Sequence, residues 1–249
     1  MARALGDVLH HFDPRLGVAP GGPPEMLAAT RSLAVAAVPL APGDLLRAGA
    51  VWNLAVEMAR LGAPGLVLAP AGDFVAGLDD GPGPLGTRLE RLAGEDLGRA
   101  ARERAAACAA ATPGLALACL PEAGFERNFA SHLEWALLLS APDAPGLAEA
   151  ERRALRVLAV RPDARVGITI HGARSLGEAR DAFERLARAV EHQHPCGLAS
   201  YGLLVDDLAL YRAIVERRPV GLARPQSPAA RALADVARLL LADAREEPR

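Results

Sequence analysis

Two histidines and a cysteine occupy alternate positions in the segment His192-Gln193-His194-Pro195-Cys196. Alternate side chains of an extended segment share one face, an arrangement that zinc ligands can have. A tetrahedral zinc site needs a further ligand, however, and none lies near in the sequence. Surface connections also collect such residues, and this segment is expected between a helix and a strand. We therefore expect no metal site here, nor at His10 and His11, which fall on the polar side of an N-terminal helical segment.

A thiol nucleophile would need surroundings that favour the thiolate. Cys119 lies near the end of an apolar run, three residues before Glu122. A neighbouring carboxylate raises the pKa of a thiol, and a free cysteine in such a run usually packs as a small hydrophobic residue. Serine catalysis has no better support, because no Gly-x-Ser-x-Gly segment occurs. The sequence therefore predicts neither kind of nucleophile.

Composition limits the classes of protein further. The 249 residues are 51% hydrophobic and 23% charged, with a formal net charge of -2. These values are typical of a globular chain and argue against a nucleic-acid partner, which would call for an excess of positive charge. All 28 basic residues are arginine, and the three cysteines have no short spacing, so we expect reduced thiols. The N-terminus lacks the uninterrupted apolar run of a signal peptide, which favours the cytoplasm.

Short apolar runs alternate with longer helical stretches along the chain, and these elements must position any site. The expected strands are 32–38, 65–69, 115–120, 135–140, 165–170 and 198–204, and the expected helices are 45–61, 85–111, 147–160, 175–192 and 228–242. This alternation predicts an α/β fold over residues 30–243, a three-layer, doubly wound and mostly parallel sheet. Ligands of such folds bind beyond the carboxyl ends of the strands.

Three further segments carry expectations of their own. Residues 1–24 form an amphipathic arm followed by a linker rich in Pro and Gly, which either packs on the domain or serves as a docking peptide. The arginines of 85–111 alternate with acidic residues, which predicts ion pairs on a solvated helix face. The last helix is followed by Asp243, Glu246 and Glu247, and this acidic end disfavours a stable membrane anchor.

Several segments, taken in order, resemble the MinD/ParA family of P-loop ATPases, especially its flagellar-number regulator FlhG. The helix Trp52-Asn53-Leu54-Ala55 to Ala59-Arg60-Leu61-Gly62 is similar to the family's VNLAxxxARLG. Residues 135–150 resemble its strand followed by TTPEPxSLxDA, and residues 166–241 resemble its C-terminal third with YLGxIPxD, RRPV and PxSxAAxAL. The resemblance implies a bacterial cytoplasmic protein with the P-loop NTPase fold. Intact relatives bind ATP and Mg²⁺ and position cell machinery through ATP-dependent dimerisation.

The phosphate-binding positions depart from this family. A gap-free count back from Asn53 places the family's GKGGVGKT on Ala41-Pro42-Gly43-Asp44-Leu45-Leu46-Arg47-Ala48. Pro42 and Arg47 stand where the family has lysines, and Ala48 replaces the Mg²⁺-binding hydroxyl. A P-loop points successive N–H groups at phosphates and adds a lysine on the β/γ oxygens. This chain contains no lysine, keeps only Gly43 of the loop glycines, and would place Asp44 beside the phosphates.

The other nucleotide-handling positions have changed as well. The family's DAD after the second strand becomes Ala69-Pro70-Ala71, and its DTPPG becomes Cys119-Leu120-Pro121-Glu122-Ala123. The base-contacting asparagine becomes His171. We therefore expect a pseudo-ATPase with no catalytic residue, cofactor or metal, acting as a scaffold or regulatory binding protein, as a homodimer or with an active MinD/ParA-type paralogue. The alternative is an ATP- and Mg²⁺-binding member with an unorthodox site formed by Arg47, Glu122 and His171.

Overall fold

The computed structural model describes residues 32–71, 81–108, 114–130 and 132–245. Its elements in order are β1 (Ala34–Leu40), α2 (Leu45–Arg60), β2 (Gly65–Pro70), β3 (Gly81–Pro82), the 3-10 turn η3 (Pro84–Gly86), β4 (Arg88–Leu92), α3 (Leu97–Ala107), β5 (Leu115–Pro121), α4 (Phe125–Ala130), β6 (Trp135–Ser140), α5 (Ala144–Val160), β7 (Arg165–Ala173), α6 (Leu176–Glu191), β8 (Ala199–Val205), α7 (Leu208–Val215), α8 (Val220–Ala223) and α9 (Pro228–Arg245). The proposed arm over residues 1–24 lies outside the described residues.

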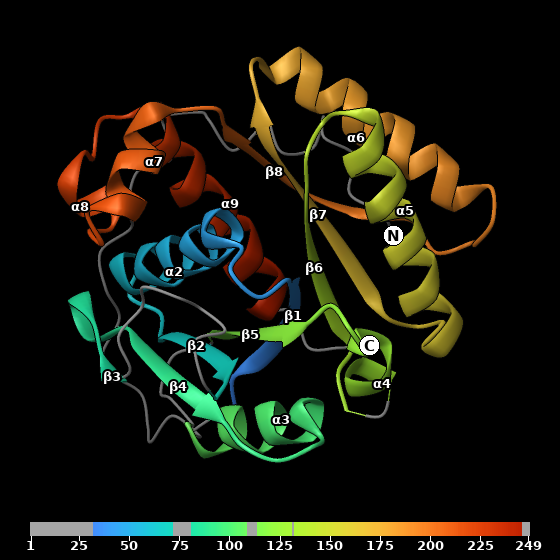
Figure 1. The fold of residues 1–249 in the computed structure, drawn as a ribbon, viewed down its shortest axis with the longest axis horizontal. Helices are drawn as coiled ribbons and strands as arrows, with labels where there is room; N and C mark the ends of the chain where they lie inside the picture. Colours follow the sequence, from blue (N-terminus) through green and yellow to red (C-terminus); the bar gives the residue numbers. More distant parts are fainter. Residues whose placement is uncertain (1–31, 72–80, 109–113, 131, 246–249) are drawn as a thin grey trace, which may run out of the picture.

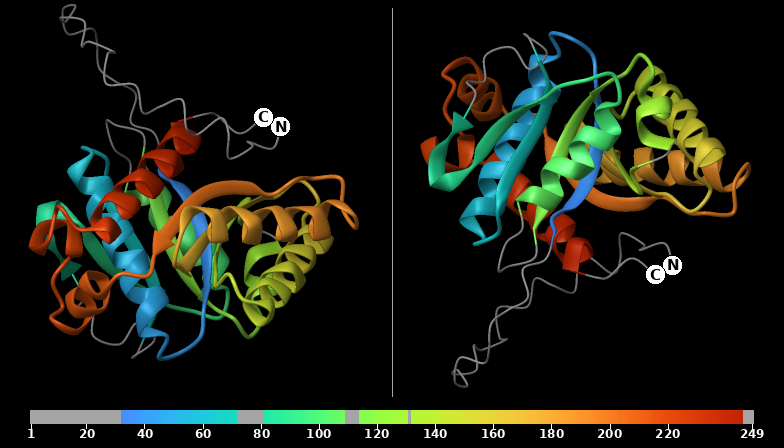
Figure 2. Two further views of the ribbon diagram at one scale, coloured as in Figure 1. Left: turned by 90° about the horizontal axis from the view of Figure 1, so that it is seen from above. Right: turned by 90° about the horizontal axis from the view of Figure 1, so that it is seen from below.

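The strands form one sheet in the order β3-β4-β2-β5-β1-β6-β7-β8 (Figure 1). All of its strand pairs are parallel except the pair of β3 with β4. Two apolar cores fill its two faces: α2, α7, α8 and α9 cover one face, and α3, α4, α5 and α6 cover the other (Figure 2). The α/β fold with a mostly parallel, three-layer arrangement is confirmed, and all six expected strands are present.

The expected helix over 85–111 is wrong in its first half. Residues 88–92 form strand β4, which pairs in parallel with β2, and only Leu97–Ala107 is helical. Leu85, Leu89 and Leu92 have helical spacing, but Leu89 and Leu92 instead insert into the core from a strand. Hydrogen bonding to the edge of β2 makes this segment a strand. Local periodicity cannot reveal such a contact, because it depends on residues elsewhere in the chain. The expected ion pairs change accordingly: Arg99 pairs with Glu103 within α3, whereas Arg104 reaches Glu90 on β4.

A buried polar contact joins the end of α9 to the sheet. The Tyr201 hydroxyl on β8 donates to Asp243 Oδ2 at 2.7 Å, and Arg165 lies 3.5 Å from the same carboxylate. The ring of Tyr201 fits against Gly167 on β7, where an added Cβ would lie 2.1 Å from it. This glycine is therefore required by the close approach of a neighbouring ring.

We expect Tyr201→Phe to lower the free energy of unfolding by about 1–2 kcal/mol, because it removes one charge-assisted hydrogen bond from a buried carboxylate. Urea unfolding followed by circular dichroism measures the change. Tyr211→Phe is the matched control, since its hydroxyl donates to Asp206 from an exposed side chain and its loss should cost about 0.5 kcal/mol or less. Equal costs for the two variants would contradict the structural role of the buried contact.

Candidate functional site

The turn between β1 and α2 lies at the carboxyl edge of the sheet. Pro42 and Gly43 form the turn, and Gly43 has a positive φ of 79°. Helix α2 begins directly afterwards at Leu45, with Asp44 as its N-cap: the Asp44 carboxylate accepts the backbone N–H of Arg47 at 3.0 Å. A short polar side chain at this position satisfies an N–H group that the helix leaves unpaired. The helix end that binds anions in other proteins is thus capped here by the chain's own carboxylate.

The Arg47 side chain is held between two acidic residues. Its Nη1 donates to Glu122 Oε1 at 3.2 Å, and its Nε lies 3.5 Å from Asp44 Oδ2. Only 19% of the side chain is exposed. Glu122 follows β5, and its backbone N–H donates to Leu40 at the end of β1. The two segments that carry Arg47 and Glu122 are therefore joined through both backbone and side chain.

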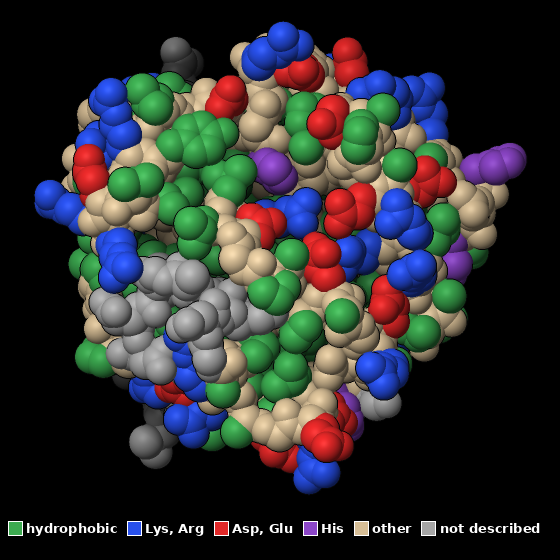
Figure 3. Space-filling model, in the orientation of Figure 1, with side chains coloured by type: hydrophobic (Ala, Val, Ile, Leu, Met, Phe, Trp, Pro, Cys, Tyr) green, Lys and Arg blue, Asp and Glu red, His purple; other side chains and the backbone are tan. Residues whose placement is uncertain are grey.

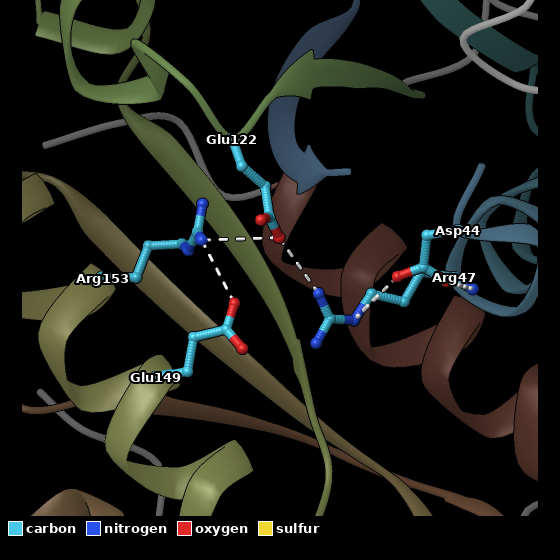
Figure 4. A network of polar contacts seen from close by, with 5 residues as sticks. All are labelled: Asp44, Arg47, Glu122, Glu149 and Arg153. Carbon is cyan, nitrogen blue, oxygen red and sulfur yellow. Dashed lines mark hydrogen bonds and ion pairs between the residues drawn. The ribbon is translucent and has the colours of Figure 1, made fainter. Parts of the chain in front are cut away.

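A second arginine extends this arrangement from α5. Arg153 Nη2 lies 3.4 Å from Glu122 Oε1 and 3.2 Å from Glu149 Oε1, so one carboxylate oxygen of Glu122 bridges two guanidinium groups (Figure 4). We call Asp44, Arg47, Glu122, Glu149 and Arg153 the arginine–carboxylate network. It has two cationic and three anionic groups. Basic and acidic side chains accordingly alternate across the centre of this molecular face (Figure 3).

His171 lies within β7, because this strand continues to Ala173 beyond its expected end at residue 170. It lines a small cavity together with Arg47, Leu139 and Tyr211. Burial lowers the pKa of His171, and the charge of Arg47 lowers it further. Its buried Nε2 has no hydrogen-bond partner among the described residues. The structure thus brings Arg47 and Glu122 into contact and places His171 nearby, without a hydrogen bond to either in the described chain.

The space around Arg47 is narrow. The cavity that Arg47 shares with His171 and the one that it shares with Glu149 and Arg153 each have a volume of about 10 Å³. A volume of this size holds one water molecule, whereas pockets for ligands of drug size have roughly 300–1,000 Å³. Ala48, at the position where the family has its hydroxyl, is buried in the core.

Two members of the network were not predicted from the sequence. Glu149 and Arg153 are four residues apart on α5, a spacing that indicates an ion pair on a helix. That signal was present in the sequence. Their contact with Glu122 was not, because it depends on how α5 packs beside the loop after β5.

The other candidate residues lie apart from the network. Cys119 is completely buried, and burial raises its pKa to about 12, so its thiol stays protonated at neutral pH. In the segment 192–196, where no metal site was expected, His194 Nδ1 accepts the backbone N–H of Cys196. Within the described chain, no group of three or more His, Cys, Asp or Glu residues is placed to hold a metal ion.

No helix in the described part of the chain is both long enough and apolar enough to cross a bilayer.

The fold matches solved structures of MinD/ParA-family proteins. MinD from Aquifex aeolicus superposes with a TM-score of 0.65 at 16% sequence identity, covering 84% of this chain and 97% of that one. MinD from Pyrococcus horikoshii, solved with Mg-ADP, gives 0.57 at 14% identity over 84% and 96%. Cyanthece McdA gives 0.59 at 9% identity over 84% and 99%. No family model and no curated protein matches the sequence.

Proposed function

We propose that this chain is a pseudo-ATPase: a protein with the MinD/ParA-like P-loop NTPase fold that functions by binding partners and has lost nucleotide chemistry. Ligands of such folds bind at the carboxyl edge of the sheet. Here the basic and acidic side chains of the arginine–carboxylate network at this edge are paired with one another. The proposal therefore assigns no catalytic residue, ATP or Mg²⁺ to this site.

The observation that carries the proposal is the state of Arg47. A P-loop cation must be free to approach phosphate oxygens, but both sides of this guanidinium already contact carboxylates, Asp44 and Glu122. A bound triphosphate would have to displace these carboxylates and overcome their repulsion. The N–H of Arg47, which could serve a phosphate, is also taken by Asp44. The residues present therefore do not fit a Mg-nucleotide.

Metal binding has equally little support from this edge of the sheet. Mg²⁺ in phosphoryl-transfer sites is held by a hydroxyl and by carboxylates beside the phosphates. Ala48 has no hydroxyl and is buried, and Ala69 stands at one of the carboxylate positions implied by the resemblance. Glu122 has a suitable oxygen, but both of its close partners are arginines.

The solved structures of similar fold suggest the kind of cellular process in which this chain takes part. They include proteins of cell division, septum-site determination and plasmid partition, and one is a complex of MinC with MinD from Aquifex aeolicus. We propose by analogy that this chain binds a protein partner in the cytoplasm, as a homodimer or paired with an active MinD/ParA-type paralogue. Such a pairing would recruit or hold cell machinery without a nucleotide cycle of its own.

The alternative function is an ATP-binding protein with an unorthodox site. Arg47 and Glu122 are in contact and His171 lies across a small cavity from Arg47, so these side chains do lie in one region. Burial and the charge of Arg47 lower the pKa of His171, so this side chain would add little positive charge to balance a phosphate. This alternative requires the network to open.

Isothermal titration calorimetry of the full chain with ATP and ADP, with and without Mg²⁺, tests the proposal. We expect no heat of binding at ligand concentrations up to about 1 mM, which corresponds to a binding free energy weaker than about -4 kcal/mol. The double variant Arg47→Lys with Ala48→Thr should not hydrolyse ATP, because the turn contains Pro42 without an N–H group and α2 begins at Leu45.

Micromolar ATP binding by the unmodified chain would overturn the proposal. The decisive companion variant is Arg47→Ala. If ATP binds to the unmodified chain and Arg47→Ala abolishes that binding, the unorthodox site is the correct interpretation.

A further inference from the structure

Helix α7 has an outward face that is apolar. Leu208, Tyr211 and Val215 have exposed fractions of 60%, 39% and 83%, and they recur at the spacing i, i+3, i+7. The opposite face is apolar as well: Leu210 and Ala213 are buried against the core. Helix α6 shows the usual pattern, because its exposed positions beyond the first turn are all charged. Helix α7 therefore presents a row of apolar side chains to the solvent.

This outward face has the geometry of a helix-pairing seam. Spacings of three and then four residues are those of positions a, d and a of a heptad, which meet a partner helix along one line. The three side chains span two helical turns, or roughly 10 Å. Exposed apolar residues grouped in this way, rather than scattered singly, mark contact sites.

The position of α7 is fixed by close packing. Ile214 lies against Gly49 of α2, where an added Cβ would approach within 2.6 Å of the isoleucine side chain. The Tyr211 hydroxyl donates to Asp206 at 3.0 Å. In Figure 1, α7 lies next to α2 and α8 at one edge of the molecule. A partner would therefore meet a surface that is already ordered, which lowers the entropic cost of binding.

Positive charge borders the seam. Arg212 shares the outward face, one residue after Tyr211, and Arg217 and Arg218 follow the helix end; all three are exposed. Among the described residues they form no ion pair. Glu216 is bound by Arg224 at 3.0 Å, and the charges of Arg224, Arg218 and Arg212 together lower its pKa. Over α7 and α8, apolar and basic side chains lie next to each other (Figure 3).

We propose that the outward face of α7 binds an acidic amphipathic helix of a partner protein. The apolar side of that helix would pack on Leu208, Tyr211 and Val215, and its carboxylates would lie beside Arg212 and the two arginines that follow. This inference rests on the proposed function, since a protein that works by binding needs a contact surface.

The structure favours a protein partner over two other occupants. A membrane-binding helix needs a longer apolar face with basic residues along it, whereas α7 has eight residues and begins after Asp206 and Asp207. A second copy would place Arg212 of one chain near the same arginines of the other, and like charges across an interface cost free energy.

The test uses full-length chain and two fluorescein-labelled peptides of about three heptads, with leucine at positions a and d. One has glutamate at the flanking positions e and g, and the other has lysine there; like charges at both flanks keep each peptide from pairing with itself. Fluorescence anisotropy should show at least about tenfold tighter binding of the glutamate peptide, and this preference should weaken with added salt.

Two variants locate the binding site. Val215→Glu should weaken binding of the glutamate peptide by about tenfold or more, and Arg212→Glu should shift the preference toward the lysine peptide. Val160→Glu is the matched control, because Val160 is a 45% exposed valine on α5 and its replacement should leave binding unchanged. Thermal unfolding of each variant should match the parent chain.

Three results would overturn the inference. The first is absence of a preference for the glutamate peptide. The second is Val215-dependent binding to vesicles of phosphatidylcholine and phosphatidylglycerol, which would identify a membrane surface. The third is a concentration-dependent dimer in light scattering that Val215→Glu abolishes. None of these results bears on nucleotide binding by the unmodified chain, so failure here is distinct from failure of the pseudo-ATPase proposal.

Discussion

Replacing Glu122 with alanine is expected to destabilise the protein and to create a binding site for a small dianion. One carboxylate oxygen of Glu122 lies 3.2 Å from Arg47 Nη1 and 3.4 Å from Arg153 Nη2. Without it, Asp44 and Glu149 are the acidic partners that the two guanidinium groups keep among the described residues. In this respect Glu122 does internally what a bound phosphate would do, since it joins cations from two helices.

The size of the effect follows from burial. The side chains of Arg47 and Arg153 are 19% and 15% exposed, and that of Glu122 is 27% exposed. Removing one member of a largely buried ion pair leaves unpaired charge, which costs several kcal/mol when burial is complete. With this partial exposure we expect a loss of about 1–3 kcal/mol in the free energy of unfolding. Differential scanning calorimetry should show a fall in Tm of roughly 2–10 °C.

Rescue by an added anion is the specific part of this prediction. Phosphate or sulfate at about 10 mM should restore roughly 1.4 kcal/mol to Glu122→Ala if the new site has a Kd near 1 mM. Sodium chloride at equal ionic strength should restore much less. The unmodified chain should respond little to either salt, which separates site binding from general stabilisation by sulfate.

Glu134→Ala is the matched control. The side chain of Glu134 is 47% exposed, and it pairs with Arg161. We expect this variant to lose about 0.5 kcal/mol or less and to show no anion-specific rescue. An equal loss in both variants, or a Glu122→Ala chain that phosphate does not stabilise, would refute the role of Glu122 as an internal anion.

The sequence was sufficient to predict the fold because the alternation of short apolar runs with helical stretches is repeated along the chain. Each buried parallel strand is a short apolar run, and each covering helix has its own periodic stripe, so six independent segments agree. The prediction failed at β4, where Leu89 and Leu92 fit both a helix and a strand. Only pairing with β2 decides between helix and strand, and the sequence does not show that the edge of β2 is available for pairing. The chain also contains α4, α7 and α8, which are too short for periodicity to reveal.

The site was predictable only in part. Counting back from Asn53 placed Arg47 at the phosphate-binding position, and the structure locates it at the carboxyl edge of the sheet. The sequence did not show that Asp44, which was expected to repel phosphate, would cap α2 and also contact Arg47. Nor did it show that Arg153 would meet Glu122, because that contact joins elements far apart in the chain. Long-range charge pairing requires the packed structure.

Asn53→Ala is expected to lower the free energy of unfolding by about 2–4 kcal/mol. The Asn53 side chain is 4% exposed, its Oδ1 accepts the N–H of Val220 at 2.7 Å, and its Nδ2 donates to Gly49 O at 2.7 Å. Alanine leaves the buried N–H of Val220 without its acceptor and opens a small cavity, and both effects destabilise. Urea unfolding measures the sum of these costs.

Amide exchange separates the lost hydrogen bond from the cavity. The N–H of Val220 should exchange much faster in Asn53→Ala, because its acceptor is gone. The exchange rates of N–H groups in β1 should change only as far as the global free energy of unfolding changes. Gln193→Ala is the control, since that amide is exposed and contacts Glu151 at 3.0 Å; its loss should cost about 0.5 kcal/mol or less. A small stability change with unaltered exchange at Val220 would contradict the assigned contact.

The same contact explains why the helix motif around Asn53 can persist without nucleotide chemistry. Its amide joins α2 to α8 across 167 residues of sequence, and its neighbours Leu54 and Ala55 are completely buried. Packing and hydrogen bonding therefore account for these residues in this chain. It follows that the most intact part of the resemblance to MinD/ParA proteins lies in the structural support of the fold, and that nucleotide binding must be judged from Asp44, Arg47 and Glu122 instead.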